Sequence, residues 1–346
     1  MSAAPAPRRR RWRWLLLAVA LLLAGVATLP LWFNANRIAA LALPAAGTAS
    51  GLVISSSGEA ELRWRPTPWL ALPNVEVRTP QGALILSAER VEIALPWATL
   101  RGQAFEVDEL QLHASFVDLE ALAAWLDSRP PSEPSPLPDL ARLEMRGGEL
   151  RWGDYALQDA DIDVIDFGPG QRFAMDAAGQ VLLAGNRHPA RLSLVATVAG
   201  DSASLRLRDL ELEMSGDDPL PELRASGDWQ LSPTWQLELA GRLAGWRQSW
   251  GELPQPFTEG TGPIDFELSQ QGESALLAPA TLRARAGDAE ASATAVPEAM
   301  LAWLGAEQRP LLPPASGSAR VPRLSFDGVQ LEGLELEVDQ TPPPPQ

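Results

Sequence analysis

The feature that most constrains the fold is an alternation of apolar and polar residues that recurs along most of the chain. Clear examples are Trp235-Gln-Leu-Glu-Leu239 and Ile264-Asp-Phe-Glu-Leu268. Successive side chains of a β-strand point to opposite faces of the sheet, so this alternation predicts strands with one apolar and one wet face. The same pattern occurs at 59–65, 75–78, 91–95, 111–113, 191–195 and 334–338. Turn-forming residues recur roughly every 10–15 residues, which is typical of a long antiparallel array. We therefore predict a mostly β protein.

The alternation changes parity once in each of three segments. These are Phe105–Leu112, Leu205–Met214 and Val329–Val338. A β-bulge shifts parity by one residue and bends the strand, so we predict a bulge in each segment. The alternative is a tight two-residue turn between short strands. Gly333 is the only good turn residue at any of the three positions, which favours the bulge.

Three segments have the spacing of helices instead. Val117–Leu126 and Val296–Leu304 repeat apolar residues at helical intervals, and we predict a short helix in each. A third short helix is expected at 34–46, ending near Pro44 and Gly47. The first helix leads into a proline-rich stretch at 129–138, predicted to be a stiff, extended linker and a sub-domain boundary. The tail 341–346 is expected to be disordered.

The N-terminus carries a topology signal. Four arginines, Arg8, Arg9, Arg10 and Arg11, precede a segment, 14–36, that contains no charged residue. A bilayer core about 30 Å thick needs about 20 apolar residues in a helix. The segment therefore predicts a transmembrane helix, with 1–13 as a basic cytoplasmic N-terminus by the positive-inside rule. A cleaved signal peptide is the alternative, but the apolar run is too long for one. The predicted anchor residues are Trp14, Leu15, Leu16, Leu17, Leu21, Leu22, Leu23, Trp32 and Phe33.

Composition excludes several classes of protein. The net charge is −16 with a pI of about 4.6, and the basic residues cluster at the predicted membrane end. This argues against nucleic-acid binding, which needs a basic face, so we expect no nucleic-acid partner. The chain has no cysteine, so neither disulfides nor zinc–thiolate sites can form.

No cluster of residues predicts catalysis. His113 is expected on the wet face of a strand, and His188 in a turn before Pro189. The run Asp159-Ala-Asp-Ile-Asp163 resembles the start of a calcium loop, but Val164 and Gly170 occupy the positions where an EF-hand needs glycine and glutamate. Alternating aspartates are better interpreted as the wet face of a strand. We expect no catalytic residue, no metal, no cofactor and no enzymatic activity.

A family resemblance rests on the region after the predicted anchor. Leu62-Arg-Trp-Arg-Pro-Thr-Pro-Trp-Leu70, Leu72–Val77, Ala83–Ala88 and Val91–Gly102 follow one another in the order found in the N-terminal region of AsmA-like proteins. Gly317–Leu331 resembles the end of that family. The resemblance covers about the first third of the chain well. It implies a bacterial inner-membrane protein with a single span, whose bulk lies in the periplasm. Residues 37–128 would be the AsmA-like β region and 139–340 the rest of the sheet.

The AsmA-like group is similar to TamB and to bridge-like lipid-transfer proteins, which implies a long, curled sheet forming a groove for acyl chains. Some 14–17 strands would give a groove of roughly 70 Å. The function expected is phospholipid transport or outer-membrane biogenesis, with the inner membrane, a phospholipid and a periplasmic or outer-membrane protein as partners. The candidate groove lining is Leu62, Trp64, Val75, Val77, Leu84, Leu86, Val91, Ile93, Leu95, Leu110 and Leu112.

Two alternatives remain open at this point. The candidate lining residues could form a closed core, in which two halves of the sheet pack on each other. The chain could also be a periplasmic structural or assembly protein, similar to subunit N of type II secretion, that meets protein partners through its sheet edges.

Overall fold

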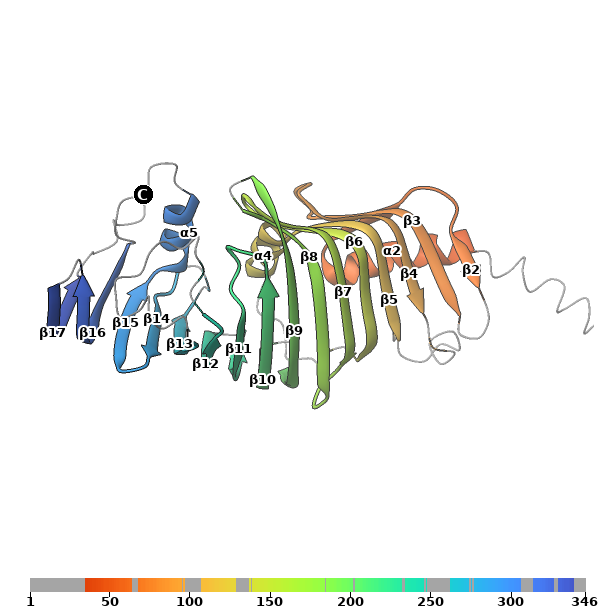
Figure 1. Ribbon diagram of the computed structural model, residues 1–346. Coiled ribbons are helices and arrows are strands. Elements are labelled where there is room, and N and C mark those ends of the chain that lie inside the picture. The colour runs from red at the N-terminus through yellow and green to blue at the C-terminus, as the bar shows by residue number, and fades with distance from the viewer. Residues whose placement is uncertain are drawn as a thin grey trace, which may run out of the picture.

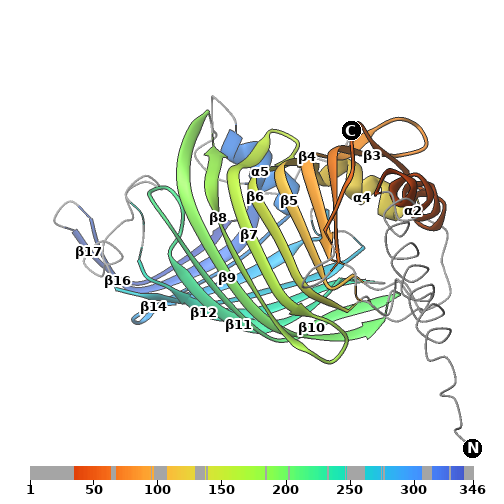
Figure 2. The same cartoon turned by 90° about the vertical axis from the view of Figure 1, so that its right-hand side faces the viewer.

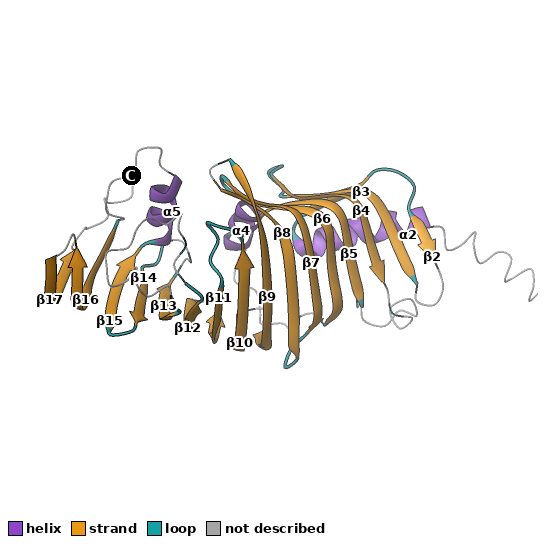
Figure 3. Ribbon diagram, in the orientation of Figure 1, coloured by secondary structure: helices purple, strands orange, loops and turns teal. Residues whose placement is uncertain are grey.

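The computed structural model describes residues 35–63, 68–94, 96, 107–128, 137, 139–183, 185–201, 203–231, 234–245, 247, 262–273, 275, 277–305, 314–326 and 329–338. The described strands form one sheet of 17 strands, and three described helices lie beside it (Figure 1). This confirms the prediction of a mostly β protein built on one long sheet. The helices and strands are coloured separately in Figure 3.

The strands differ in length along the sheet. The short ones lie at the N-terminal end and the longest in the middle, where β9 has 16 residues. The strands are β1 Val53–Ser56, β2 Glu61–Arg63, β3 Trp69–Arg78, β4 Leu84–Ala94, β5 Glu109–Asp118, β6 Leu140–Trp152, β7 Tyr155–Phe167, β8 Arg172–Leu183, β9 Asn186–Asp201, β10 Ser204–Gly216, β11 Leu223–Gln230, β12 Trp235–Leu243, β13 Ile264–Gly272, β14 Ala280–Ala286, β15 Ala289–Ala295, β16 Ala315–Phe326 and β17 Val329–Val338.

Each strand from β3 onward pairs with the next strand in the chain, and β1 and β2 both pair with the other edge of β3. Among the described residues, nothing joins β17 back to the first strands, so the sheet is open. Strands β3 to β9 curve around the side on which α4 and α2 lie (Figure 2). At about 4.8 Å per strand, the sheet is about 70 Å long.

One pair departs from the predicted antiparallel arrangement: β5 and β6 run parallel. Between them the chain forms α4 (Leu119–Asp127), which returns it to the starting end of the sheet. Parallel neighbours require such a crossover, whereas antiparallel neighbours can be joined by a tight turn. The proline-rich stretch belongs to this crossover, and its residues 129–136 and 138 lie outside the described residues. The sub-domain boundary predicted there does not divide the sheet.

The helix after the predicted anchor is longer than expected. It spans Ala35–Ser50 (α2) and continues through Pro44 and Gly47, where the sequence predicted its end. The helix ends at Gly51, whose φ of 73° suits a glycine, and the Gly51 N–H donates to the Gly47 carbonyl at 2.8 Å. Gly47 has a packing role, because a Cβ there would lie 2.8 Å from the Leu52 carbonyl oxygen.

The other two helices lie within two residues of their predicted positions. Asp118 caps α4, since its side chain accepts a hydrogen bond from the Ala121 N–H at 2.9 Å. Helix α5 (Pro297–Gly305) begins with a proline at its first position, where the missing N–H costs nothing.

The described helices include none that is both long and apolar enough to span a membrane. The predicted span 14–36 lies outside the described residues except for its last two positions, which begin α2. The tail 341–346 also lies outside them.

The three predicted bulges have different outcomes. In β10 the register with both neighbouring strands shifts by one residue around Asp209, whose φ is 50°, so the bulge in 205–214 is confirmed. In 105–112 the prediction is wrong for the described part, because β5 begins at Glu109, after the parity change. In 329–338 the pairing with β16 keeps one register throughout, so no residue is inserted, although Gly333 has a φ of 70°.

Candidate functional site: the apolar face of the sheet

The two faces of the sheet are chemically distinct along its whole length. Residues that lie opposite each other on neighbouring strands share a face, so the strand register defines rows across the sheet. One row takes one residue from every strand between β2 and β17, and every member is apolar or glycine. We call it the apolar row: Leu62, Leu70, Ile93, Leu110, Leu143, Val164, Met175, Leu194, Leu212, Ala225, Gly241, Phe266, Ala284, Ala291, Ala319 and Leu336.

Both sequence neighbours of each member lie on the other face. One neighbour from each strand, again matched by the strand register, forms the polar row. Its members are Glu61, Ala71, Glu92, Gln111, Glu144, Asp163, Asp176, Ser193, Glu213, Arg224, Arg242, Asp265, Arg285, Glu290, Arg320 and Glu335. Only Ala71 is not polar. The alternation in the sequence therefore produces a sheet with one continuous apolar face and one continuous polar face.

The N-terminal third of the apolar face is a closed core. Its buried cluster includes Leu70, Val91 and Leu112, and Ala39 of α2 belongs to the same cluster. Leu119 of α4 also packs against it. Leu70, at 3% exposure, shows how completely this part is covered. The two helices therefore occupy the space in which a bound molecule would otherwise contact these strands.

Most of the candidate lining residues predicted from the sequence belong to this closed core. The structure brings eight of them together in one cluster, in which three are buried and five are partly buried. These eight are Leu62, Val75, Val77, Leu86, Val91, Ile93, Leu110 and Leu112.

The remaining three candidates are placed differently. Leu86 pairs with Val77, and Leu84 pairs with the next residue, Arg78. Ile85 is therefore an extra residue in β4, and Leu84 does not continue the pairing of Leu86 with Val77. Trp64 and Leu95 lie outside the described residues. These candidates therefore lie in a closed core, as in the alternative interpretation, but helices α2 and α4 cover them instead of a second half of the sheet.

A second buried cluster follows in the middle of the sheet. It is formed by Phe173, Leu194, Ala196, Val198, Leu207 and Leu210, all from β8, β9 and β10. Trp229 and Leu239 pack at its margin, as does Leu137 of the crossover segment. Among the described residues, its members come from strands and this crossover, and none comes from a helix.

Beyond β12 the apolar face is only partly covered by the described residues, although Ala289 of β15 is still buried at 4% exposure. Among the described residues, none from β13 to β17 belongs to either buried cluster. Leu282 of β14 is 42% exposed and Leu336 of β17 is 49% exposed, although both continue the apolar face. We call the apolar face of β13–β17 the open apolar region. Around the two leucines it is lined mainly by alanine and glycine, which leave more room above the backbone than leucine does.

A polar contact fixes the border of this region. Gln270 lies on the apolar face of β13 and is 7% exposed. Its side-chain oxygen accepts a hydrogen bond from Trp235 Nε1 at 2.7 Å. Its Nε2 donates to the carbonyl oxygens of Ala275 and Ala278 at 2.6 and 2.8 Å. One buried amide thus holds the β13–β14 connection against the apolar face, with every polar group satisfied.

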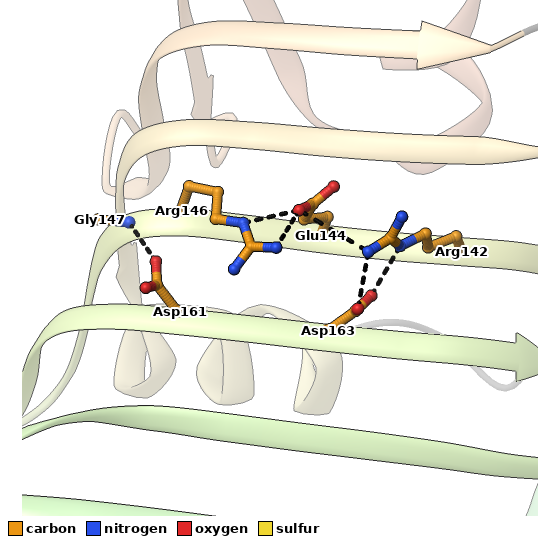
Figure 4. A network of polar contacts seen from close by, with 6 residues as sticks. All are labelled: Arg142, Glu144, Arg146, Gly147, Asp161 and Asp163. Carbon is orange, nitrogen blue, oxygen red and sulfur yellow. Dashed lines mark hydrogen bonds and ion pairs between the residues drawn. The ribbon is translucent and has the colours of Figure 1, made fainter.

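The polar face is held together by ion pairs between neighbouring strands. Arg142 on β6 donates from Nε and Nη2 to the two carboxylate oxygens of Asp163 on β7, at 2.8 and 2.7 Å (Figure 4). This bond holds the pKa of Asp163 below its usual value and raises that of Arg142. Glu144 accepts from Arg146 on the same strand, and the Gly147 N–H donates to Asp161 at 3.0 Å.

The same arrangement continues toward the C-terminus. Arg242 bonds Asp265 at 2.7 Å, Arg285 bonds Glu290 at 2.9 Å and Arg320 bonds Glu335 at 2.7 Å. Hollows of about 770 and 700 Å³ lie on this face between the long charged side chains. Since the guanidinium groups that line them already bind carboxylates, these hollows offer no free cationic group for an anionic ligand.

The residues considered for metal binding and catalysis lie on different strands of the sheet. Asp161 and Asp163 lie on the polar face as predicted, and Asp159 occupies a left-handed position with φ 49°. His188 is inside β9, opposite Val181, so the turn predicted there is wrong. His113 lies on β5, far along the sheet from His188. In the part of the chain that the structure describes, no group of three or more His, Cys, Asp or Glu residues could hold a metal ion.

No family model, no curated protein and no solved structure matches this chain. The site therefore has to be argued from its own geometry. Sequence reasoning missed the open apolar region. The alternation at 334–338 already indicates Leu336, whereas Leu282 lies in Ala-Thr-Leu-Arg-Ala-Arg-Ala, where alanines make the apolar face hard to recognise.

Proposed function

We propose that this chain is a lipid-handling protein, anchored in the bacterial inner membrane by residues 14–36, that holds acyl chains of phospholipids on its apolar face in the periplasm. A single observation carries the proposal: the apolar face continues to β17, but among the described residues its buried clusters end at β12. A soluble domain normally buries such a surface, and an apolar patch left open usually marks a binding surface.

The chemistry of the open apolar region suits an acyl chain. An acyl chain gains about 0.8 kcal/mol for each CH₂ group that it removes from water. Shielding six to eight CH₂ groups would contribute about 5–6 kcal/mol, without any specific polar contact. Alanine and glycine on β14, β15 and β16 leave space for the chain, and the leucines at 282 and 336 flank it. The resemblance to AsmA-like proteins supports the same role in phospholipid transport or outer-membrane biogenesis.

The two ends of the sheet have different roles in this proposal. The N-terminal end is filled by α2 and α4 and serves as the base next to the membrane. The C-terminal end receives the lipid. The groove lining is therefore moved from β2–β5, where the sequence predicted it, to β13–β17.

The test uses neighbouring residues on opposite faces. In the variant Leu282→Gln/Leu336→Gln, two exposed apolar-face side chains become polar. In the control Arg283→Gln/Glu337→Gln, the adjacent polar-face residues change instead. The full chain is extracted in mild detergent, incubated with phosphatidylethanolamine carrying a photoreactive acyl chain, and irradiated. We expect severalfold less cross-linked lipid on the first variant and an unchanged amount on the control.

Circular dichroism and thermal unfolding establish that both variants fold. Equal cross-linking to both variants, or no lipid on the wild-type chain, would contradict the proposal. The chain would then be a scaffold acting through protein contacts.

A further inference from the structure

The two edges of the sheet are built differently. At the N-terminal edge, β3 is covered in two pieces by β1 and β2, which have four and three residues. Between them Asn74 turns the backbone, with φ 47°, and its side-chain amide donates to the Ser57 carbonyl at 3.2 Å. Helix α2 also packs against both short strands. Short, interrupted edge strands prevent pairing with another sheet, so this edge is blocked.

The C-terminal edge has no such protection. Strand β17 has ten residues and pairs with β16 in one unbroken register from Phe326–Val329 to Gly317–Val338. No described residue pairs with its other edge. At about 3.4 Å per residue the free edge is about 34 Å long, and half of its backbone N–H and C=O groups point outward. A long unpaired edge of this kind is a template for another strand.

The charge of β17 selects the partner. Its residues Glu332, Glu335 and Glu337 are all exposed, and the strand contains no basic residue. Glu335 and Glu337 share the polar face; Glu335 pairs with Arg320, whereas Glu337 lies opposite Ser318. Elsewhere on this face carboxylates meet arginines of the neighbouring strand, as Glu213 meets Arg224 and Asp265 meets Arg242. The last strand in this succession of cross-strand ion pairs, β17, therefore carries acidic side chains and no basic one.

A second copy of the chain does not fit this edge. Two β17 strands pairing antiparallel through residues 334–338 would place glutamate opposite glutamate in each register that keeps these apolar residues on one face. Like charges directly opposite each other destabilise a sheet. The blocked N-terminal edge of a second copy is also unsuitable.

We infer that the free edge of β17 binds, by strand addition, a strand of a different protein in which arginine or lysine alternates with apolar residues. The basic side chains meet Glu337 and its neighbour Glu335 on the polar face. The apolar side chains continue the apolar face beyond Leu336 and Val338. The partner's sheet would thereby lengthen the apolar face, and this inference stands independently of whether that face carries lipid.

The experiment uses a fluorescent nine-residue peptide of alternating arginine and valine with the full chain in detergent. Binding is followed by fluorescence anisotropy. The variant Glu337→Lys reverses the charge at the edge and should weaken binding about fivefold. The control Glu267→Lys makes the same change on the polar face of β13, inside the sheet, and should bind as the wild type does.

Two further peptides separate strand addition from general attraction to an acidic protein. One has the same composition without alternation, and the other carries N-methyl groups on alternate residues, which remove backbone donors. Both should bind much more weakly than the alternating peptide.

Equal binding of the N-methylated peptide, or equal loss in the interior control variant, would overturn the inference. A concentration-dependent dimer of the wild-type chain that the alternating peptide dissociates would also overturn it, in favour of a second copy. Lipid cross-linking should be the same for Glu337→Lys as for the wild type, so failure of one proposal does not imply failure of the other.

Discussion

Arg142 and Asp163 form a two-point ion pair across β6 and β7, with both guanidinium–carboxylate distances below 2.9 Å. The pair is partly shielded, since the side chains are 38% and 25% exposed. Its two parallel hydrogen bonds fix the relative position of the two strands, in addition to their backbone register. It is the most shielded cross-strand ion pair of the described polar face for which both contacts are hydrogen bonds.

The first prediction concerns the pH dependence of this pair. Arg142 lowers the pKa of Asp163 in the folded chain. A lowered pKa stabilises the fold above the unfolded value of about 3.9, and this stabilisation is lost as the pH falls through the folded pKa. Arg142→Gln should therefore reduce the free energy of unfolding at pH 7, and the difference from the wild type should shrink toward pH 3. Urea unfolding at the two pH values measures this.

The control for that experiment is Arg242→Gln, which removes the partner of Asp265. Both side chains of that pair are at least 60% exposed, so its loss should lower stability less than Arg142→Gln does. Equal effects of the two variants, or a difference that grows on acidification, would contradict the explanation.

The second prediction concerns the buried amide of Gln270. Gln270→Leu leaves the Trp235 indole N–H and the carbonyls of Ala275 and Ala278 without their partner. The expected loss is about 2–4 kcal/mol in the free energy of unfolding, because buried polar groups without partners are costly. Guanidinium unfolding followed by tryptophan fluorescence measures it. Gln271→Leu, an exposed change on the next residue, should be nearly neutral, and a similar loss there would refute the role of the amide.

The third prediction concerns close approach of strands on the apolar face. A Cβ at Gly241 would lie 2.2 Å from the Arg224 carbonyl oxygen on β11. Gly241→Ala should therefore separate the two strands locally and cost about 1–3 kcal/mol. Gly262→Ala is the matched change, since nothing lies within 4 Å of a Cβ there. Thermal unfolding of both variants gives the comparison, and a stable Gly241→Ala protein would show that β11 and β12 can move apart freely.

The fourth prediction concerns the bulge in β10. Asp209 has a φ of 50°, a conformation that suits glycine and disfavours β-branched residues. Asp209→Gly should retain the stability of the wild type, and Asp209→Val should be about 1–2 kcal/mol less stable than Asp209→Gly. Equal stability of the two variants in chemical denaturation would mean that the bulge relaxes when its residue is changed.

The sequence predicted the local elements of this fold well, because they depend on residues close together in the chain. Alternation at 235–239 and 264–268 identified β12 and β13, and helical spacing at 117–126 identified α4. The parity change at 205–214 identified the bulge at Asp209. Each of these signals is determined by neighbouring side chains, so no tertiary contact was needed to recognise it.

The features that depend on distant contacts could not be recognised in this way. Parallel pairing of β5 with β6 depends on where the crossover returns the chain. Pro44 and Gly47 remain inside α2 because the helix is supported by packing against the sheet. Above all, alternation shows that a strand has an apolar face but not what covers it. Val91 and Leu282 have equivalent patterns, yet the first is buried and the second is 42% exposed.

The pairing of nearly every strand with its neighbours in the chain makes the molecule a one-dimensional array. In such an array, stability is approximately a sum of terms for each unit and each adjacent interface, and opening can begin at an end and spread inward. The N-terminal end of the sheet is packed against α2 and α4 in the first buried cluster. No described residue of β13–β17 belongs to either of the two buried clusters. Amide hydrogen exchange should therefore be fastest in β17 and slow progressively toward β3, so that the strand offered to a partner is also the one that opens most readily.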